Sequence, residues 1–153
     1  MEFRRADHRD CLDLLAWRND PAAVAASLTG AGVDEAAHRA WFARVLADPG
    51  RILLIAEADG AKLGMVRFDR GADGWWEVSI NLDPAARGRG LAAAILRGGI
   101  GAAFAGGDRP PLSARVRRDN PASWKIFERC GFAVEEVKAG IGHFRLAPAC
   151  PDS

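Results

Sequence analysis

Several residue types are scarce in this chain of 153 residues. Tyrosine is absent, so no reaction carried by this chain can use a phenol as acid or base. There are only three cysteines, Cys11, Cys130 and Cys150, an odd number with no Cys-x-x-Cys spacing and no paired histidines. We therefore expect neither a disulfide framework nor a zinc or other metal site.

Net charge is also nearly absent, since 21 basic and 20 acidic residues leave a net charge of +1. Nucleic-acid binders usually carry a basic excess, so we expect no nucleic-acid partner. No apolar run is long enough to cross a bilayer, and the N-terminus is charged from Glu2 onward, unlike a secretion signal. We expect a cytoplasmic protein without membrane contact.

The length and composition indicate a single folded unit. About half of the residues are apolar, 49%, which is enough for a real core, and 153 residues leave no room for two such cores. We expect one domain over residues 1–147 and a short tail over residues 148–153.

The most informative segment is Arg-Gly-Arg-Gly-Leu-Ala at residues 87–92. It follows an alternating strand, residues 76–82, and precedes an alanine-rich helix from Leu91 to about Phe104. Glycines let amide N–H groups point at an anion, and a helix N-terminus adds unpaired donors and a favourable dipole. The pattern predicts a pyrophosphate cradle, with Arg87 and Arg89 placed to clamp oxygens from the side.

A second strand and helix follow. Residues 112–117 alternate as a strand, then Asn120 caps a helix that Pro121 opens and Gly131 ends. Together the strand, the Arg-x-x-Gly-x-Ala turn, the second strand and the Asn-x-x-Ser segment leading to Cys-Gly-Phe resemble the GNAT superfamily of acetyl-CoA-dependent N-acetyltransferases. The resemblance extends from Trp75 to Phe132.

This resemblance implies a cosubstrate, acetyl-CoA, and the residues that hold it. In that family the first turn holds the pyrophosphate, the preceding strand hydrogen-bonds the pantetheine arm, and the Asn of the second helix touches the cofactor. The positions implied for cofactor binding here are Ile80, Leu82, Arg87, Gly88, Arg89, Gly90, Leu91, Ala92, Asn120 and Ser123.

The resemblance also fits the order of elements expected along the chain. Strands are predicted at residues 1–5, 52–57, 62–68, 76–82, 112–117, 133–137 and 143–146, with an Asp59-Gly60 hairpin turn. Helices are predicted at residues 7–18, 34–47, 91–104 and 121–130, and Asp20-Pro21 is expected to break the first. The order is βααβββαβαββ, an α/β (α+β) fold whose mixed, twisted sheet of about seven strands has splayed central strands.

The chemistry implied is direct attack of a neutral amine on the acetyl thioester, which needs a base nearby. Glu77 is the leading base, because it lies on the strand before the glycine turn; the alternative is a solvated charge at the strand end. Ser79 and Asn81 share its face. Many family members place a tyrosine seven residues after the Asn, as the acid for the departing thiolate; here that position is Phe127, and the acid stays unassigned.

Two clusters in the N-terminal half suggest an acceptor site. Trp17-Arg18-Asn19 closes the first helix, and His38, Trp41 and Phe42 share a face of the second. With residues 65–69, these clusters resemble the branch that acetylates amino groups on nucleotide-linked sugars in surface-glycan and flagellin glycosylation. Arg18, Asn19, His38 and Trp41 are thus candidate substrate residues, and Arg18, Arg67 or Arg115 would pair the nucleotide phosphates.

Structural explanations stand beside these assignments. The aromatic residues at helical spacing also fit a core, His38 fits a buried structural histidine, and Arg18 and Asn19 fit a helix end. Three functions remain open: acetylation of a nucleotide-linked amino sugar, acetylation of ribosomal-protein N-termini, and non-catalytic acyl-CoA binding. Oligomers are common in the superfamily, so the resemblance allows a homodimer here.

Overall fold

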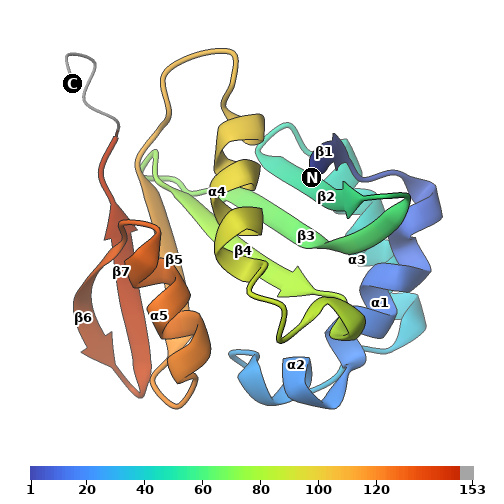
Figure 1. Ribbon diagram of the computed structural model, residues 1–153, viewed down its shortest axis with the longest axis horizontal. Coiled ribbons are helices and arrows are strands. Elements are labelled where there is room, and N and C mark those ends of the chain that lie inside the picture. Colours follow the sequence, from blue (N-terminus) through green and yellow to red (C-terminus); the bar gives the residue numbers. More distant parts are fainter. Residues whose placement is uncertain (149–153) are drawn as a thin grey trace.

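The structure, a computed structural model, describes residues 1–148. It contains a seven-stranded sheet of order β1-β2-β3-β4-β5-β7-β6 (Figure 1). Only the β4–β5 pair is parallel, so the sheet is mixed, as expected. The strands are β1 (Glu2–Arg5), β2 (Arg51–Ala58), β3 (Ala61–Arg70), β4 (Trp76–Leu82), β5 (Leu112–Arg117), β6 (Ala133–Lys138) and β7 (Ile141–Leu146).

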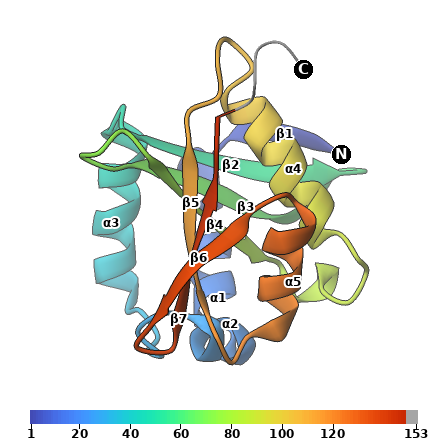
Figure 2. The same cartoon turned by 90° about the vertical axis from the view of Figure 1, so that its left-hand side faces the viewer.

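Helices cover both faces of the sheet. They are α1 (Cys11–Asn19), α2 (Pro21–Ala26), α3 (Glu35–Ala47), α4 (Ala92–Ala103) and α5 (Pro121–Arg129). Viewed along the sheet, α3 lies on one side and α4 and α5 on the other (Figure 2). No helix within residues 1–148 is long and apolar enough to cross a membrane.

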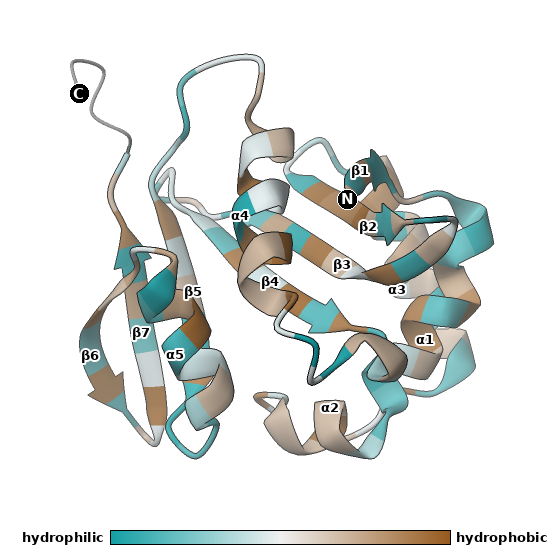
Figure 3. Cartoon of the chain, viewed as in Figure 1, coloured by the Kyte–Doolittle hydropathy of each residue, from teal (hydrophilic) through white to brown (hydrophobic). Residues whose placement is uncertain are grey.

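Two apolar clusters result from this layering. Alternate residues of β2 belong to different clusters: Leu53 and Ile55 pack with α1 and α3, whereas Ile52 and Leu54 join the cluster that contains Ile95 of α4. A strand buried on both faces needs an apolar run rather than alternation, and Figure 3 shows this hydrophobic colouring along β2. The core therefore fixes the strands on which the site is built.

Most predicted elements are confirmed, including the β2–β3 hairpin, whose turn residues Asp59 and Gly60 have φ of 53° and 78°. The first predicted helix instead starts as a 3₁₀ turn, His8–Asp10, that leads into α1. The predicted tail is described only at residue 148; Cys150 and the rest of residues 149–153 lie outside the described residues.

Helix α2 is absent from the predicted order. Asp20-Pro21 does end α1, as expected, but it also begins α2: the Asp20 carboxylate accepts hydrogen bonds from Ala22 N at 3.1 Å and Ala23 N at 3.4 Å, and Pro21 occupies the first helical position. Proline is favourable there because its missing N–H would be unpaired anyway. The observed order is therefore βαααβββαβαββ.

The central strands separate, as expected. β4 and β5 pair only at Trp76 with Leu112 and at Glu77 with Ser113. Beyond Glu77 the two strands diverge (Figure 1), so the edge of β4 from Val78 onward has no partner strand on the β5 side. This opening leaves backbone donors and acceptors for something other than a strand.

Candidate functional site

The turn between β4 and α4 is open on the side where an anion would lie. Gly88 and Gly90 have φ of +74° and +72°, a left-handed region that glycine occupies without strain. A Cβ built on either would meet no atom within 4 Å. Leu91 precedes α4 without a side-chain cap, which leaves the first amides of the helix to an external acceptor. The turn thus fits a pyrophosphate.

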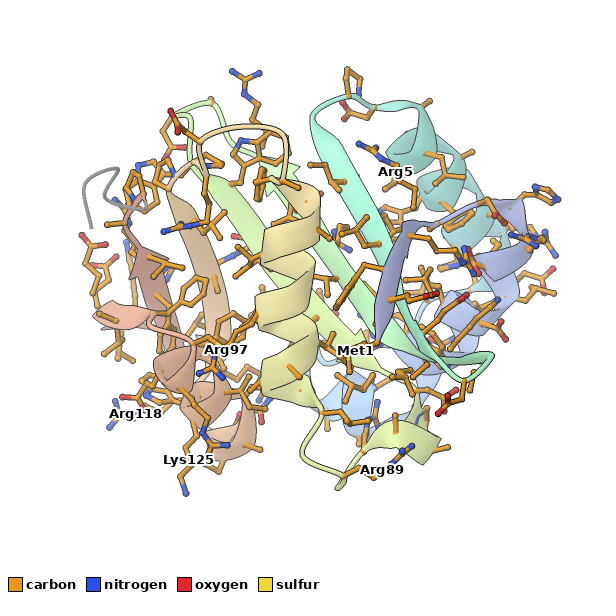
Figure 4. All side chains as sticks on the ribbon, turned by 45° about the horizontal axis from the view of Figure 1, so that its top comes forward. Met1, Arg5, Arg89, Arg97, Arg118 and Lys125 are labelled. Atoms are coloured by element: carbon orange, nitrogen blue, oxygen red, sulfur yellow. The ribbon has the colours of Figure 1, made fainter. Side chains whose placement is uncertain are left out.

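The two arginines of this turn differ. The Arg87 guanidinium forms an ion pair with Asp20 and donates to Leu82 O at 3.2 Å, so it is directed at the start of α2 rather than free to clamp an anion. This pairing holds the pKa of Asp20 below its usual range. Arg89 is exposed on the turn that leads into α4 (Figure 4), so of these two arginines it is the more accessible to an anion.

A cavity of about 600 Å³ lies beside the divergence of β4 and β5. Its walls come from α1, α2, the loop after α2, α3, the strands β3, β4 and β5, and the start of α5. The predicted residues that it brings together are Glu77, Ile80, Asn120, Ser123, Arg18, His38 and Trp41. Asn19, Leu82 and residues 87–92 do not line it. Leu82 is the last residue of β4, on the part of the strand that is not paired with β5, and residues 87–92 follow it in the chain.

Glu77 is held by a partner that local spacing did not reveal. Arg115 of β5 donates to both carboxylate oxygens, from Nε at 2.8 Å and from Nη2 at 2.9 Å. This pair raises the pKa of Arg115. A carboxylate has about four acceptor positions, so Glu77 keeps capacity for a proton from an amine or a water while its orientation is fixed.

His38 and Asn19 make contacts that position the helices. His38 is 3% exposed, and its Nε2–H donates to Cys11 O at 2.8 Å, joining α3 to α1. Asn19 donates from Nδ2 to Val33 O and accepts from Val33 N, both at 2.7 Å. The His38 contact matches its structural explanation, although His38 also lines the cavity. The Asn19 bonds instead tie the end of α1 to the loop before α3, rather than capping the helix.

Trp41 and Arg18 offer different surfaces to a ligand. The guanidinium of Arg67 lies 5.2 Å from the centroid of the Trp41 ring, so one face of this ring is already covered by a cation. Arg18 Nη1 is buried and has no hydrogen-bond partner among the described residues. Its Nη2 lies 3.5 Å from Thr29 Oγ1.

The start of α5 supplies the remaining wall. Asn120 caps this helix by accepting from Ser123 N at 3.3 Å, and both residues line the cavity. Phe127, at the position where the family often has tyrosine, is 4% exposed and packs edge-on against Phe132 at 5.2 Å between ring centroids. Within residues 1–148, no cluster of three His, Cys, Asp or Glu side chains could hold a metal ion.

Sequence reasoning missed the contribution of the α2 region. Ala23, Ala26 and residues 27–29 line the cavity, but small and aliphatic residues in a short helix carry no recognisable chemical signal. The ion pairs Glu77–Arg115 and Arg87–Asp20 join residues 38 and 67 positions apart, and no local spacing encodes such pairs.

Comparison with known proteins adds to this geometry. The sequence profile of the acetyltransferase (GNAT) domain matches residues 1–133. Mycothiol acetyltransferase from Mycobacterium sp. (strain JLS) is 32% identical over 116 residues, which cover 72% of this chain and 37% of that protein. The chain thus spans little more than a third of the length of the curated relatives it matches.

Solved structures share the fold over nearly the whole chain. The putative acetyltransferase yncA from Salmonella typhimurium, determined with its cofactor acetyl-CoA, is 27% identical with a TM-score of 0.75, covering 100% of this chain and 98% of that one. Spermidine N-acetyltransferase from Vibrio cholerae, in complex with CoA and spermine, has a TM-score of 0.78 at 14% identity, covering 94% and 92%. With its split sheet, its open glycine turn and a profile match over residues 1–133, this chain belongs to the acetyltransferase (GNAT) domain family.

Proposed function

We propose that this chain transfers the acetyl group of acetyl-CoA to a primary amine by direct attack. The observation that carries the proposal is the open glycine turn at the N-terminus of α4, next to the unpaired edge of β4. The Salmonella typhimurium protein with acetyl-CoA, similar over nearly the whole chain, supports it.

Acetyl-CoA would be held by the turn and by β4. The amides of residues 88–92 and the Arg89 side chain suit the pyrophosphate, and the backbone near Ile80 and Leu82 suits the pantetheine arm. Asn120 and Ser123 lie at the far wall of the opening. When bound, acetyl-CoA supplies an activated acyl group on a thiol leaving group whose pKa is about 8.5, by analogy with cysteine.

The residues of the chain would then manage the proton of the amine. Glu77, oriented by Arg115, accepts that proton directly or through a water held near Ser79 and Asn81. Phe127 occupies the position of the usual acid, and the chain has no tyrosine, so a phenol does not protonate the leaving thiolate. The thiol is acidic enough to leave without that help at a moderate cost in rate.

We propose a nucleotide-linked amino sugar as the acceptor. The cavity volume of about 600 Å³ is in the range of small-molecule sites, and five arginines line it: Arg18, Arg44, Arg67, Arg115 and Arg117. A peptide N-terminus would instead be attracted by acidic residues, and Glu77 is the single carboxylate among the described lining residues. The cationic lining therefore favours the sugar over the alternative of a ribosomal N-terminus.

Calorimetry would test both parts of this proposal. We expect acetyl-CoA to bind, and UDP to bind separately when acetyl-CoA is saturating and the pyrophosphate turn is filled. Binding of acetyl-CoA without any UDP binding would redirect the search to peptides and free amines. A chain that binds acetyl-CoA but acetylates no amine would support the non-catalytic alternative, and a chain that does not bind acetyl-CoA would overturn the enzyme assignment.

A further inference from the structure

The five arginines of the cavity are not equally available to a ligand. Arg115 is paired with Glu77, Arg67 Nε donates to Asp69 at 2.9 Å, and Arg117 Nη2 lies 2.9 Å from Asp119. These three guanidinium groups are already neutralised by carboxylates. Arg18 and Arg44 have no carboxylate within 4.0 Å among the described residues, and of these two Arg44 is the more exposed.

Arg18 differs from the others in having a buried donor without an acceptor. Its Nη1 has no hydrogen-bond partner within residues 1–148, and its other terminal nitrogen, Nη2, donates only a long hydrogen bond of 3.5 Å to Thr29 Oγ1. A buried donor left unpaired is costly, and the cost is larger for a charged group. The position of Arg18 at the C-terminal end of α1 accounts for a positive charge there but not for an unpaired, buried N–H.

The surroundings of Arg18 hold it in place. Trp17, the preceding residue, is 4% exposed in the core under α1, and the following residue, Asn19, is bonded twice to Val33. The bonds to Val33 tie the end of α1 to the loop before α3. Because Trp17 is fixed in the core, the backbone at Arg18 is ordered before any ligand arrives, which lowers the ordering cost of binding.

We propose that Arg18 binds an anionic group of the acceptor, a phosphate or a carboxylate, and so selects amines that carry one. This inference rests on the proposed acetyltransferase function and narrows its substrate class. A guanidinium offers two parallel N–H donors to a phosphate or carboxylate, which fills the missing acceptor of Nη1. Polyamines and neutral amino sugars bring no such acceptor and are poor substrates.

Variants of Arg18 test the proposal. Arg18→Gln removes the charge, and Arg18→Lys keeps the charge but loses the planar fork. The matched control is Arg39→Gln on α3, since Arg39 is exposed, pairs with Glu35 at 3.2 Å and does not line the cavity. Within residues 1–148 the Arg18 side chain makes a single, long hydrogen bond, so we expect all three variants to fold and to bind acetyl-CoA as the wild type does.

Two probes distinguish the source of the anion. UDP is titrated into free and acetyl-CoA-saturated protein, and acetylation of methionine, glucosamine and spermidine is compared. If the anion is a phosphate, UDP affinity falls roughly 10- to 100-fold in Arg18→Gln, less in Arg18→Lys, and not in Arg39→Gln. If it is a carboxylate, UDP does not bind, and the KM for methionine rises by a similar factor in Arg18→Gln with little change in kcat.

Other outcomes overturn the inference. Equal UDP affinity and equal KM values in wild type and Arg18→Gln would remove the role of Arg18, as would efficient acetylation of glucosamine or spermidine that does not depend on Arg18. Those results would leave the acetyltransferase function standing. If the wild type does not bind acetyl-CoA, the proposed function is overturned instead. The UDP titration of the free protein would still decide whether Arg18 binds an anion.

Discussion

At the scale of single residues, Gly90 combines two properties that bear on the proposed pyrophosphate cradle. It has a left-handed φ of +72°, and the space beside its Cα is open. The first property concerns backbone strain, and the second concerns room for a ligand, so a substitution tests both at once unless a control separates them.

We expect Gly90→Val to weaken acetyl-CoA binding by at least about 100-fold, because the branched side chain adds strain and fills the space proposed for the pyrophosphate. Calorimetry measures the affinity. Gly74→Val is the control, since Gly74 has φ of +83° and equally open surroundings in the loop before β4. Equal loss in both variants would show that strain alone is responsible, and unchanged affinity in Gly90→Val would contradict the cradle.

We expect Glu77→Gln to lower kcat by about 100- to 10,000-fold and to leave the affinity for acetyl-CoA unchanged, because a carboxamide keeps the shape but cannot accept the proton. Steady-state kinetics across pH give the measurement. Arg115→Gln is the companion variant, since it keeps the carboxylate and removes the group that orients it. Wild-type turnover in Glu77→Gln would transfer the base role to water or to another residue.

At the scale of elements, α2 and its following loop are held by side-chain bonds rather than by a core. Helix α2 contains no buried residue. The segment is tied by the ion pair of Asp20 with Arg87, by the bonds of Asn19 to Val33, and by Arg117 Nη1, which donates to Ser27 O at 3.3 Å. Segments with few apolar contacts open at low free-energy cost. These bonds therefore decide how firmly this wall of the cavity is closed.

We expect Arg87→Gln to increase amide hydrogen exchange in residues 22–30 several-fold, because one of these ties is lost. Exchange measured by mass spectrometry reports it. Arg89→Gln, two residues away and exposed on the same turn, should leave exchange in α2 unchanged while weakening acetyl-CoA binding. The same exchange pattern in both variants would mean that the Asp20–Arg87 pair does not hold α2.

Elements with a strong local pattern could be predicted from the sequence. β4, the glycine turn and α4 follow from alternation, two glycines and an alanine-rich run, and α5 follows from Asn120-Pro121. Helix α2 could not, because six residues give no apolar period and Pro21 equally suits a break and a helix start.

The residues of the site also fall into those that the sequence predicts and those that it does not. The positions of Glu77, Asn120 and Ser123 on the cavity follow from local motifs. The partners of Glu77 and Arg87 depend on how distant segments meet in the fold, so the sequence alone did not show that Arg87 is directed at Asp20.

At the scale of the whole molecule, a buried carboxylate joins the N-terminal segment to the sheet. Asp10 is fully buried; it accepts from Arg4 at 2.8 and 2.9 Å and from the backbone of Asp7 at 2.9 Å, and Lys62 Nζ of β3 lies 2.7 Å away. Burial alone would raise the pKa of Asp10, but the hydrogen bonds from Arg4 and Lys62 outweigh it and hold the pKa below its usual range.

We expect the free energy of unfolding to fall as pH decreases below about 4. A carboxyl whose pKa is lower in the folded than in the unfolded state stabilises the fold above its unfolded pKa, about 3.9, and this contribution is lost as pH falls toward the folded value. Asp10→Asn should cost about 3 kcal/mol at pH 7, because two cations lose their buried partner, and should flatten the pH dependence.

Urea unfolding from pH 3 to pH 7 makes the measurement. Asp13→Asn is the control, because Asp13 contacts the same Lys62 at 2.8 Å but its side chain is 52% exposed. Equal effects of the two substitutions would contradict the special weight given to the buried carboxylate.

The seven strands form two groups, β1–β4 and β5–β7, joined along the β4–β5 seam by only two residue pairs (Figure 1). A ligand seated in that seam contacts both groups and completes the sheet where the chain itself does not. A ligand bound only by the folded state adds about 2.7 kcal/mol to stability at a concentration 100 times its Kd. With acetyl-CoA in that place, we expect the lifetime of this protein in a cell to follow the supply of acetyl-CoA, so that scarcity of the acetyl donor would deplete the protein as well as slow its reaction.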